Sequence, residues 1–191
     1  HLMDQGLTAA EWEQRLKWRV GWNRYIAKYM NDENYENFFQ QNRRQYDGTQ
    51  LKVAHILIRK ENIKDLASES ALLTSVKADI ESDKLSFTAA ATQYSQSPTA
   101  KKGGELGWIE WVQPMPASFT KAAFVLKPGG ISKPVSTPFG LHLITVLEEK
   151  PGNKTWQQTR KALREGMREF LFTWSVDQQR EKTEVQILRE W

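Results

Sequence analysis

Apolar and polar residues alternate along two segments of this chain, and each segment carries one histidine. Over 51–59 the alternation places His55 on an apolar face, and over 141–148 it does the same for His142. Period-two alternation is typical of half-buried strands, so the pattern predicts two strands with one inward-facing histidine each. Shorter segments at 106–109 and 131–136 predict two further strands.

The segments between these strands repeat their apolar residues at helical spacing. The spacing predicts helices over 8–30, 32–44, 64–82, 86–94, 117–125 and 154–181. Thr8 and Glu11 have the spacing of a capping box at the start of the first helix. Residues 184–188 predict a short edge strand. Strand, helices and a closing hairpin together predict an α+β fold with a mostly antiparallel sheet.

Turn-forming residues divide the chain into three zones. All seven prolines lie from Pro98 to Pro151, whereas both ends of the chain lack proline and can hold long helices. We therefore predict an N-terminal helical arm at 1–50, a central domain at 51–151 and a C-terminal helical arm at 152–191.

Both arms carry rows of aromatic and apolar residues at helical spacing. An isolated helix of this length is marginal in water, so each row needs an apolar partner, and the nearest one is the other arm. Core packing between the arms explains most of each row. Any apolar surface left over would mark a binding site. The rows are Trp18, Trp22, Tyr25 and Tyr29 in the first arm, and Trp156, Leu163, Met167, Phe170 and Trp174 in the second.

Composition narrows the functional classes. The net charge is only +4 and basic residues are not clustered, which disfavours nucleic acid as a partner. Cysteine is absent, which excludes disulfides and thiolate catalysis, and the histidines lack the further partners that a metal needs. No segment has the run of about 18 apolar residues that crosses a membrane. The opening His-Leu-Met is typical of a cloning scar, so we expect an excised segment without its targeting sequence.

Four segments follow one another in an informative order. They are AHILI at 54–58, YSQSPTAKKGGELGW at 94–108, PASFTKAAFVLKPGGIS at 116–132 and FGLHLI at 139–144. This order resembles the parvulin family of peptidyl-prolyl cis/trans isomerases over 51–151. The resemblance implies a four-stranded sheet with surrounding helices, and rotation of X-Pro bonds without a cofactor or metal. A buried histidine pair that only fixes strand register is the simpler interpretation of His55 and His142 taken alone, and the two roles do not exclude each other.

The resemblance also implies roles for single residues. The catalytic positions would be His55, Ser97, Thr137 and His142, with the histidines hydrogen-bonded to each other beneath the substrate. Substrate-binding positions would be Leu106, Met115, Phe119, Phe124 and Phe139, with Phe119 as a partly exposed wall. Gly103, Gly104 and Gly107 would let the loop approach the substrate backbone.

Ser97 departs from the family pattern. Many members carry cysteine or aspartate at this position, and a serine hydroxyl is neither a thiolate nor a carboxylate. A lower turnover is therefore expected. The alternative function is a catalytically weak or inactive holdase that only binds unfolded chains, and a third is an interaction domain of a larger assembly.

The arms resemble, more loosely, those of the SurA-like and PrsA-like foldases of bacteria, in which both chain ends form a chaperone module. That resemblance implies an extracytoplasmic location, in the periplasm or cell envelope. It also implies unfolded or partly folded polypeptides with X-Pro bonds as partners. Self-association through the aromatic helices is a further expectation.

Overall fold

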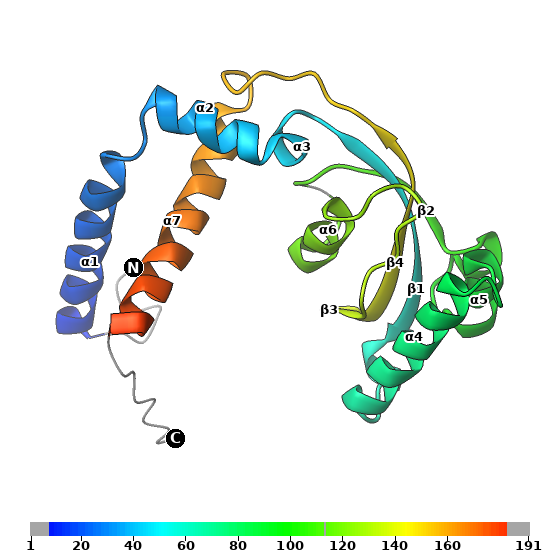
Figure 1. Ribbon diagram of the computed structural model, residues 1–191. Helices are drawn as coiled ribbons and strands as arrows, with labels where there is room; N and C mark the ends of the chain where they lie inside the picture. Colours follow the sequence, from blue (N-terminus) through cyan, green and yellow to red (C-terminus); the bar gives the residue numbers. More distant parts are fainter. Residues whose placement is uncertain (1–7, 113, 183–191) are drawn as a thin grey trace. The chain divides into compact units, whose positions relative to one another are not determined.

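The computed structural model describes residues 8–112 and 114–182, which form two compact units. The helical unit combines 1–42 with 155–191, and the sheet unit comprises Arg43–Lys154 (Figure 1). The two ends of the chain thus share a unit. The boundaries differ from those expected at 50/51 and 151/152, because residues on both sides of the central segment cluster with the sheet.

The sheet unit is built on two long central strands. β1 (Gln50–Arg59) pairs with β4 (Gly140–Lys150), and β2 (Glu105–Ile109) and β3 (Val135–Thr137) form the outer strands. The strand order is β2-β1-β4-β3, and every neighbouring pair is antiparallel (Figure 1). The predicted α+β fold with a four-stranded antiparallel sheet and surrounding helices is confirmed.

The hairpin strand expected at 131–136 is shorter than predicted. Only Val135–Thr137 joins the sheet as β3, whereas Ile131 makes one isolated antiparallel bridge to Thr145. Pro134 lies between these two contacts and has no backbone N–H to donate, so a continuous ladder is interrupted.

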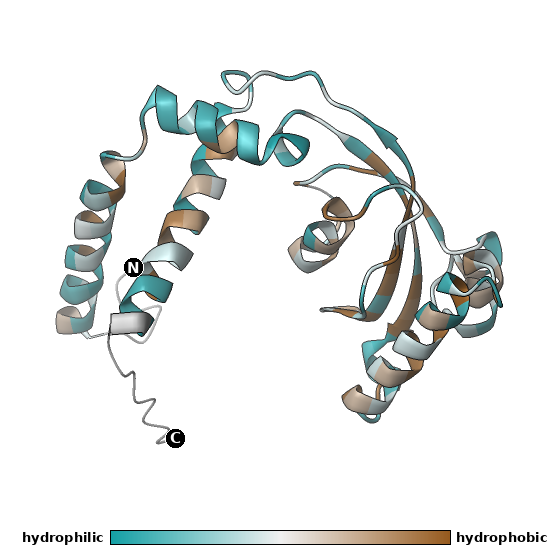
Figure 2. Cartoon of the chain, in the orientation of Figure 1, coloured by the Kyte–Doolittle hydropathy of each residue, from teal (hydrophilic) through white to brown (hydrophobic). Residues whose placement is uncertain are grey.

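Helices cover both faces of the sheet (Figure 1). α4 (Leu66–Glu81) and α5 (Phe87–Tyr94) pack on one face, in a buried cluster that includes Ile56. α6 (Ala117–Phe124) packs on the opposite face, in a cluster that includes Ile144. Successive residues of a strand point to opposite faces, so β1 and β4 supply apolar side chains to both clusters. Figure 2 shows the hydrophobic colouring along the central strands. Two short 3-10 helices are η2 (Lys60–Asn62) and η3 (Ala100–Lys102).

The helical unit contains α1 (Ala9–Ala27), α2 (Asp32–Gln41) and α7 (Arg160–Lys182). The predicted capping box starts α1: the Glu11 side chain accepts from the Thr8 N–H at 2.7 Å, and Thr8 Oγ1 accepts from the Glu11 N–H at 3.3 Å. Among the described residues, no helix has the length and apolar character needed to cross a membrane. The strand predicted at the C-terminal end, over 184–188, lies outside the described residues.

The helix expected over 32–44 is interrupted. Asn42 leaves the helical conformation, with φ −122° and ψ 25°, and its side-chain amide donates a 2.8 Å hydrogen bond to the backbone oxygen of Phe38. The chain resumes as the short helix α3 (Arg43–Tyr46), which belongs to the sheet unit. Asparagine favours such an end because its side chain competes with the helical backbone for hydrogen bonds.

The C-terminal helix also begins later than predicted, at Arg160 and not near 154. The Lys154 N–H donates to the backbone oxygen of Asp47 at 2.9 Å, and this bond holds the segment outside the helix. The Asp47 side chain, which is buried, accepts from both the N–H and the hydroxyl of Thr49 at 2.9 and 2.6 Å. Thr49 in turn accepts from the Gly152 N–H at 3.0 Å. These bonds join the two segments that connect the sheet unit to the arms.

Aromatic rings pack the helical unit together. Trp22 meets Phe172 edge to face at 5.8 Å between ring centroids, and Tyr35 stacks on Trp156 at 6.4 Å. The row predicted for the C-terminal arm is partly wrong. Trp156 lies before α7, and Phe170 and Trp174 are exposed, whereas the buried side chains of α7 recur four residues apart. Those buried residues are Leu163, Met167 and Leu171.

Candidate functional site

The two predicted strands bring the histidines together. β1 and β4 pair in the register Leu57–His142 and His55–Ile144, so the two histidines lie one diagonal step apart. Their Nδ1 atoms are 3.0 Å apart, which is hydrogen-bond distance. The expected juxtaposition of His55 and His142 is therefore present.

A hydroxyl group lies within hydrogen-bond distance of the outer nitrogen, Nε2, of each ring. Ser97 Oγ lies 2.9 Å from His55 Nε2, and Thr137 Oγ1 lies 2.8 Å from His142 Nε2. All four residues for which the sequence suggested catalytic roles thus join one hydrogen-bond chain. Thr99 extends it, with its Oγ1 3.0 Å from Ser97 Oγ. Thr99 was not predicted from the sequence, although it is a second hydroxyl residue two positions after Ser97.

The chain of hydrogen bonds can run in two directions. In one, the Ser97 hydroxyl donates to His55, His55 donates from Nδ1 to His142, and His142 donates from Nε2 to Thr137. In the other, every proton is reversed and the Ser97 hydroxyl donates to Thr99. Both arrangements place one proton between the two Nδ1 atoms, and protonation of both rings would place two N–H groups face to face there.

Burial favours the neutral pair. His55 is 4% exposed and His142 is 2% exposed. Desolvation disfavours the charged imidazolium and lowers the pKa of each histidine from 6.5 to about 4, with the nearby His55 as a smaller cause for His142. All four ring nitrogens are already engaged within the protein. The histidines are therefore arranged to position neighbouring groups rather than to donate a proton to a ligand.

Phe119 covers both imidazoles. Its ring lies edge-on to His55 at 6.0 Å and to His142 at 5.4 Å between centroids. The expectation that Phe119 is a partly exposed wall is wrong, because its side chain is 0% exposed and belongs to the core cluster under α6. Its spacing in the sequence could not distinguish a wall from a core residue, since a side chain on a short helix can serve as either.

The remaining apolar positions occupy different environments. Leu106 and Met115 are half-buried against the same core cluster as Phe119. Phe124 is buried, with its ring 5.4 Å from that of Trp111. Phe139 is 60% exposed at the turn between β3 and β4. Leu106 and Met115 thus retain some exposed surface beside the cluster that contains Phe119, and their substrate-binding roles stay predictions.

The glycines after Ser97 serve the fold more directly than expected. A Cβ on Gly104 would lie 2.2 Å from the backbone oxygen of His55, and Gly104 has φ +77°. The Gly104 oxygen accepts from the His55 N–H at 2.9 Å. The close approach is thus to β1 itself, and it fixes the backbone of the histidine. A Cβ on Gly107 would meet nothing within 4 Å.

Within the described part of the chain, no group of three or more histidine, cysteine, aspartate or glutamate side chains is arranged to hold a metal ion. The polar chain around His55 and His142 is completed by hydroxyl groups. These are hydrogen-bonding groups rather than the carboxylates or thiolates that would complete a metal site.

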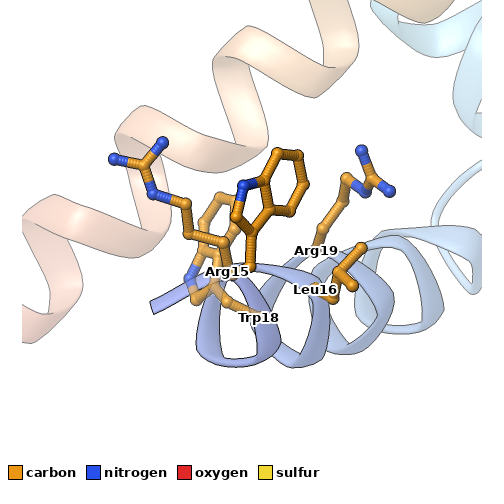
Figure 3. Close-up of a pocket in the computed structure, with 5 residues that line it drawn as sticks. Arg15, Leu16, Trp18 and Arg19 are labelled. Carbon is orange, nitrogen blue, oxygen red and sulfur yellow. The ribbon is translucent and has the colours of Figure 1, made fainter. Parts of the chain in front are cut away.

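A separate cavity of about 370 Å³ lies on α1 in the helical unit (Figure 3). Its lining combines aromatic and apolar side chains with two arginines, and it is formed by Trp12, Arg15, Leu16, Trp18 and Arg19. The Nε1 atom of Trp12 is buried and has no hydrogen-bond partner among the described residues.

Comparison with known proteins identifies the class to which the sheet unit belongs. Residues 55–148 match the family described as Rotamase, PPIC-type PPIASE domain. This segment contains all four members of the histidine chain and lies within the sheet unit. The chain therefore carries a peptidyl-prolyl isomerase domain of the parvulin type.

Individual relatives refine this assignment. A protein of Bordetella avium named Chaperone SurA is 39% identical over 119 residues, which cover 62% of this chain and 23% of the relative. A solved PpiC-type peptidyl-prolyl cis-trans isomerase domain is 25% identical with a TM-score of 0.50, covering 58% of this chain and 99% of that domain. The chain spans about a quarter of the length of the curated relatives it matches.

One solved structure covers both units. Peptidylprolyl isomerase PrsA from Bacillus cereus aligns with 96% of this chain and 78% of its own, with a TM-score of 0.50. Its sequence identity is 21%, so the likeness concerns the fold alone.

Proposed function

We propose that this chain catalyses cis/trans isomerisation of X-Pro bonds in unfolded or partly folded polypeptides. The observation that carries the proposal is the neutral hydrogen-bond chain through His55 and His142, set in a domain of the isomerase family beside half-buried apolar residues. Ser97 and Thr137 hold the outer ring nitrogens of this chain, and Leu106 and Met115 supply the apolar contact for proline.

The chemistry needs no covalent step. Rotation about an amide bond has a barrier of about 18–20 kcal/mol, because the planar amide loses its resonance. A site that binds the twisted amide more tightly than the planar one lowers this barrier. About 4 kcal/mol of such differential binding gives a thousandfold acceleration. In this proposal Phe119 fixes the two imidazoles, and the imidazoles fix the polar groups around the proline site.

Exchange spectroscopy on a panel of X-Pro peptides tests this function. We expect the full chain to accelerate exchange for several residues before proline, and EDTA to leave the rate unchanged. Rates equal to the uncatalysed background across the panel would exclude the isomerase. A chain that binds the same peptides without accelerating exchange would instead support the holdase alternative.

A second proposed function is the holding of unfolded chains by the helical unit. The unit exposes several large apolar side chains, and the curated relatives carry the name Chaperone SurA. Arg15 and Arg19 flank this surface, which suits client segments that combine apolar side chains with carboxylates. Self-association would cover the same surface. The exposed residues are Leu16, Trp18, Val20, Phe170, Phe172 and Trp174.

Aggregation assays separate holding from catalysis. Trp18→Ala removes the most exposed tryptophan side chain of the cavity, and it should lower the suppression of aggregation while the isomerase rate stays unchanged. Arg15→Gln should weaken holding of acidic clients only. Sedimentation at rising protein concentration checks whether self-association competes with client binding. Unchanged suppression in the Trp18 variant would place the client site elsewhere.

We further propose that the two units act as separate domains and that the protein works outside the cytoplasm. The location is supported by the resemblance to bacterial foldases of the SurA and PrsA kind. Fractionation of cells that express the natural full-length protein tests it, and a cytoplasmic pool alone would contradict it.

A further inference from the structure

α6 has few local means of fixing its ends. Its N-cap residue, Pro116, makes no side-chain cap hydrogen bond. The last carbonyl groups of any helix lack partners within the helix and need them from elsewhere. Here the backbone oxygens of Phe124 and Leu126 find their partner far away in the sequence.

That partner is Arg44, on α3. Its Nη1 donates to the oxygens of Phe124 and Leu126, both at 2.6 Å. The other side of the guanidinium faces Glu149 on β4, with Nε to Oε1 at 3.1 Å and Nη2 to Oε2 at 2.7 Å. This two-bond fork is geometry that arginine makes and lysine does not. Both side chains are about one-quarter exposed, so water screens the pair only in part.

The helix held in this way is the one that carries the site. Phe119 lies on α6 and contacts both imidazoles, and Met115 lies just before the helix against the same cluster. A cation at the C-terminal end also interacts favourably with the helix dipole. A shift of α6 along the sheet would therefore move Phe119 and Met115 together relative to the histidine chain.

We propose that Arg44 is a positioning residue for isomerisation: it locks the C-terminal end of α6 to β4 and thereby sets the width of the proline site. The proposal rests on the proposed isomerase function. Arg44 and Glu149 both lie outside residues 55–148, so the family match does not assign them. The contacts of Arg44 thus join α3, where the chain enters the sheet unit, to α6, the helix that covers the histidines.

The test uses the full chain with Arg44→Met, Arg44→Lys and Glu149→Gln. Arg44→Met should raise KM for an X-Pro peptide about tenfold and lower kcat less than about threefold, because the histidine chain stays intact. Arg44→Lys should raise KM about threefold, since one ammonium keeps a carbonyl contact but loses the fork. Glu149→Gln should raise it about twofold.

A second measurement separates positioning from general destabilisation. Amide hydrogen exchange should accelerate at the end of α6 in the Arg44 variants, while β1 and β4 keep their protection. Arg43→Met is the matched control: this neighbour on α3 has a 59% exposed side chain, and its contact with Asp47 is 3.5 Å long. We expect its KM and exchange pattern to equal those of the unmodified chain.

A KM for Arg44→Met within twofold of the unmodified chain, or faster exchange spread evenly over α6, β1 and β4, would overturn the proposal. If Arg44→Met fails to fold, the other two variants decide, and an unchanged KM in both has the same meaning. If the unmodified chain binds X-Pro peptides but shows no isomerase rate, the proposed function fails independently. Peptide affinity by fluorescence titration then replaces KM, and loss of affinity confined to the Arg44 and Glu149 variants still supports the positioning role.

Discussion

The two units differ in how far other elements cover their largest aromatic side chains. In the sheet unit Phe119 is fully buried against two imidazoles, whereas in the helical unit Trp18 keeps 58% of its surface exposed although its ring stacks on Trp22. The sheet supplies two apolar faces, each covered by helices, and Phe119 lies in the buried cluster on one of them. In the described part of the helical unit, α2 buries Tyr35 and Phe39, whereas α1 and α7 leave several large apolar side chains exposed. An aromatic residue is thus core where sheet and helix enclose it, and surface on the side of a helix that no described element covers.

The difference between an enclosed and an exposed aromatic ring is tested most sharply by two phenylalanines of the sheet unit. Phe119→Ala should destabilise the fold by about 3–5 kcal/mol, because it removes a fully buried ring from the core. Phe139→Ala is the matched control, since its ring is 60% exposed and its loss should cost less than about 0.5 kcal/mol. Urea unfolding of both variants measures the difference. Equal losses would mean that burial does not distinguish the two positions.

The buried histidine pair predicts a pH dependence of stability. Each histidine has a pKa of about 4 when folded and about 6.5 when unfolded, so the unfolded chain binds more protons between these values. The stabilisation is complete above pH 6.5, falls as the pH drops from 6.5 towards 4, and levels off below. A shift of this size corresponds to about 3 kcal/mol for one histidine.

Urea unfolding at steps from pH 8 to pH 4.5 measures this loss. Ring nitrogen shifts of His55 and His142 should stay those of neutral imidazoles down to about pH 5. Protonation of either ring near pH 6.5 in the folded chain would contradict the neutral hydrogen-bond chain.

Separating the two units tests whether isomerisation and the holding of unfolded chains belong to different units. A fragment of Arg43–Lys154 should fold and retain the isomerase rate, but it should no longer suppress aggregation. A shorter fragment, 51–151, lacks the bonds from Asp47 to Thr49 and Lys154, and we expect it to be less stable by about 1–3 kcal/mol. Thermal unfolding compares the fragments. Full aggregation suppression by the longer fragment would place the client site on the sheet unit.

The smallest expected effect concerns the direction of the hydrogen-bond chain. Thr99→Val removes the acceptor that the Ser97 hydroxyl needs in one direction, and should fix the proton of His55 on Nδ1 at a cost of about 1 kcal/mol or less. Thr137→Val leaves a His142 Nε2–H without an acceptor, and should therefore favour the opposite arrangement. Nitrogen NMR of the imidazole rings measures the tautomers in both variants. The same tautomers in the two variants would show that the hydroxyl groups do not control direction.

Periodicity predicted the central strands and most helices, because burial of one face leaves a repeating mark in the sequence. The capping box of Thr8 and Glu11 was recognisable because its contacts are local. The boundary at Asn42 and the late start of α7 were not, since each depends on a hydrogen bond whose competing partner the pattern does not reveal. The predicted buried row through Phe170 and Trp174 was wrong for a related reason. Helical spacing shows which residues share one side of a helix, but not which side packs against another element.

The sequence by itself determined the fold class, the order of the motifs and the inward face of each histidine, because alternation fixes which residues of each strand face inward. The pairing of His55 with His142 was implied by the resemblance to the parvulin family. Only the tertiary structure decided that Phe119 is fully buried, that Thr99 extends the hydrogen-bond chain and that Arg44 holds α6. Arg44 and Leu126 are brought together by the folding of the whole sheet unit. Contacts between residues so far apart in the sequence depend on how the sheet and the helices pack, so local sequence patterns do not predict them.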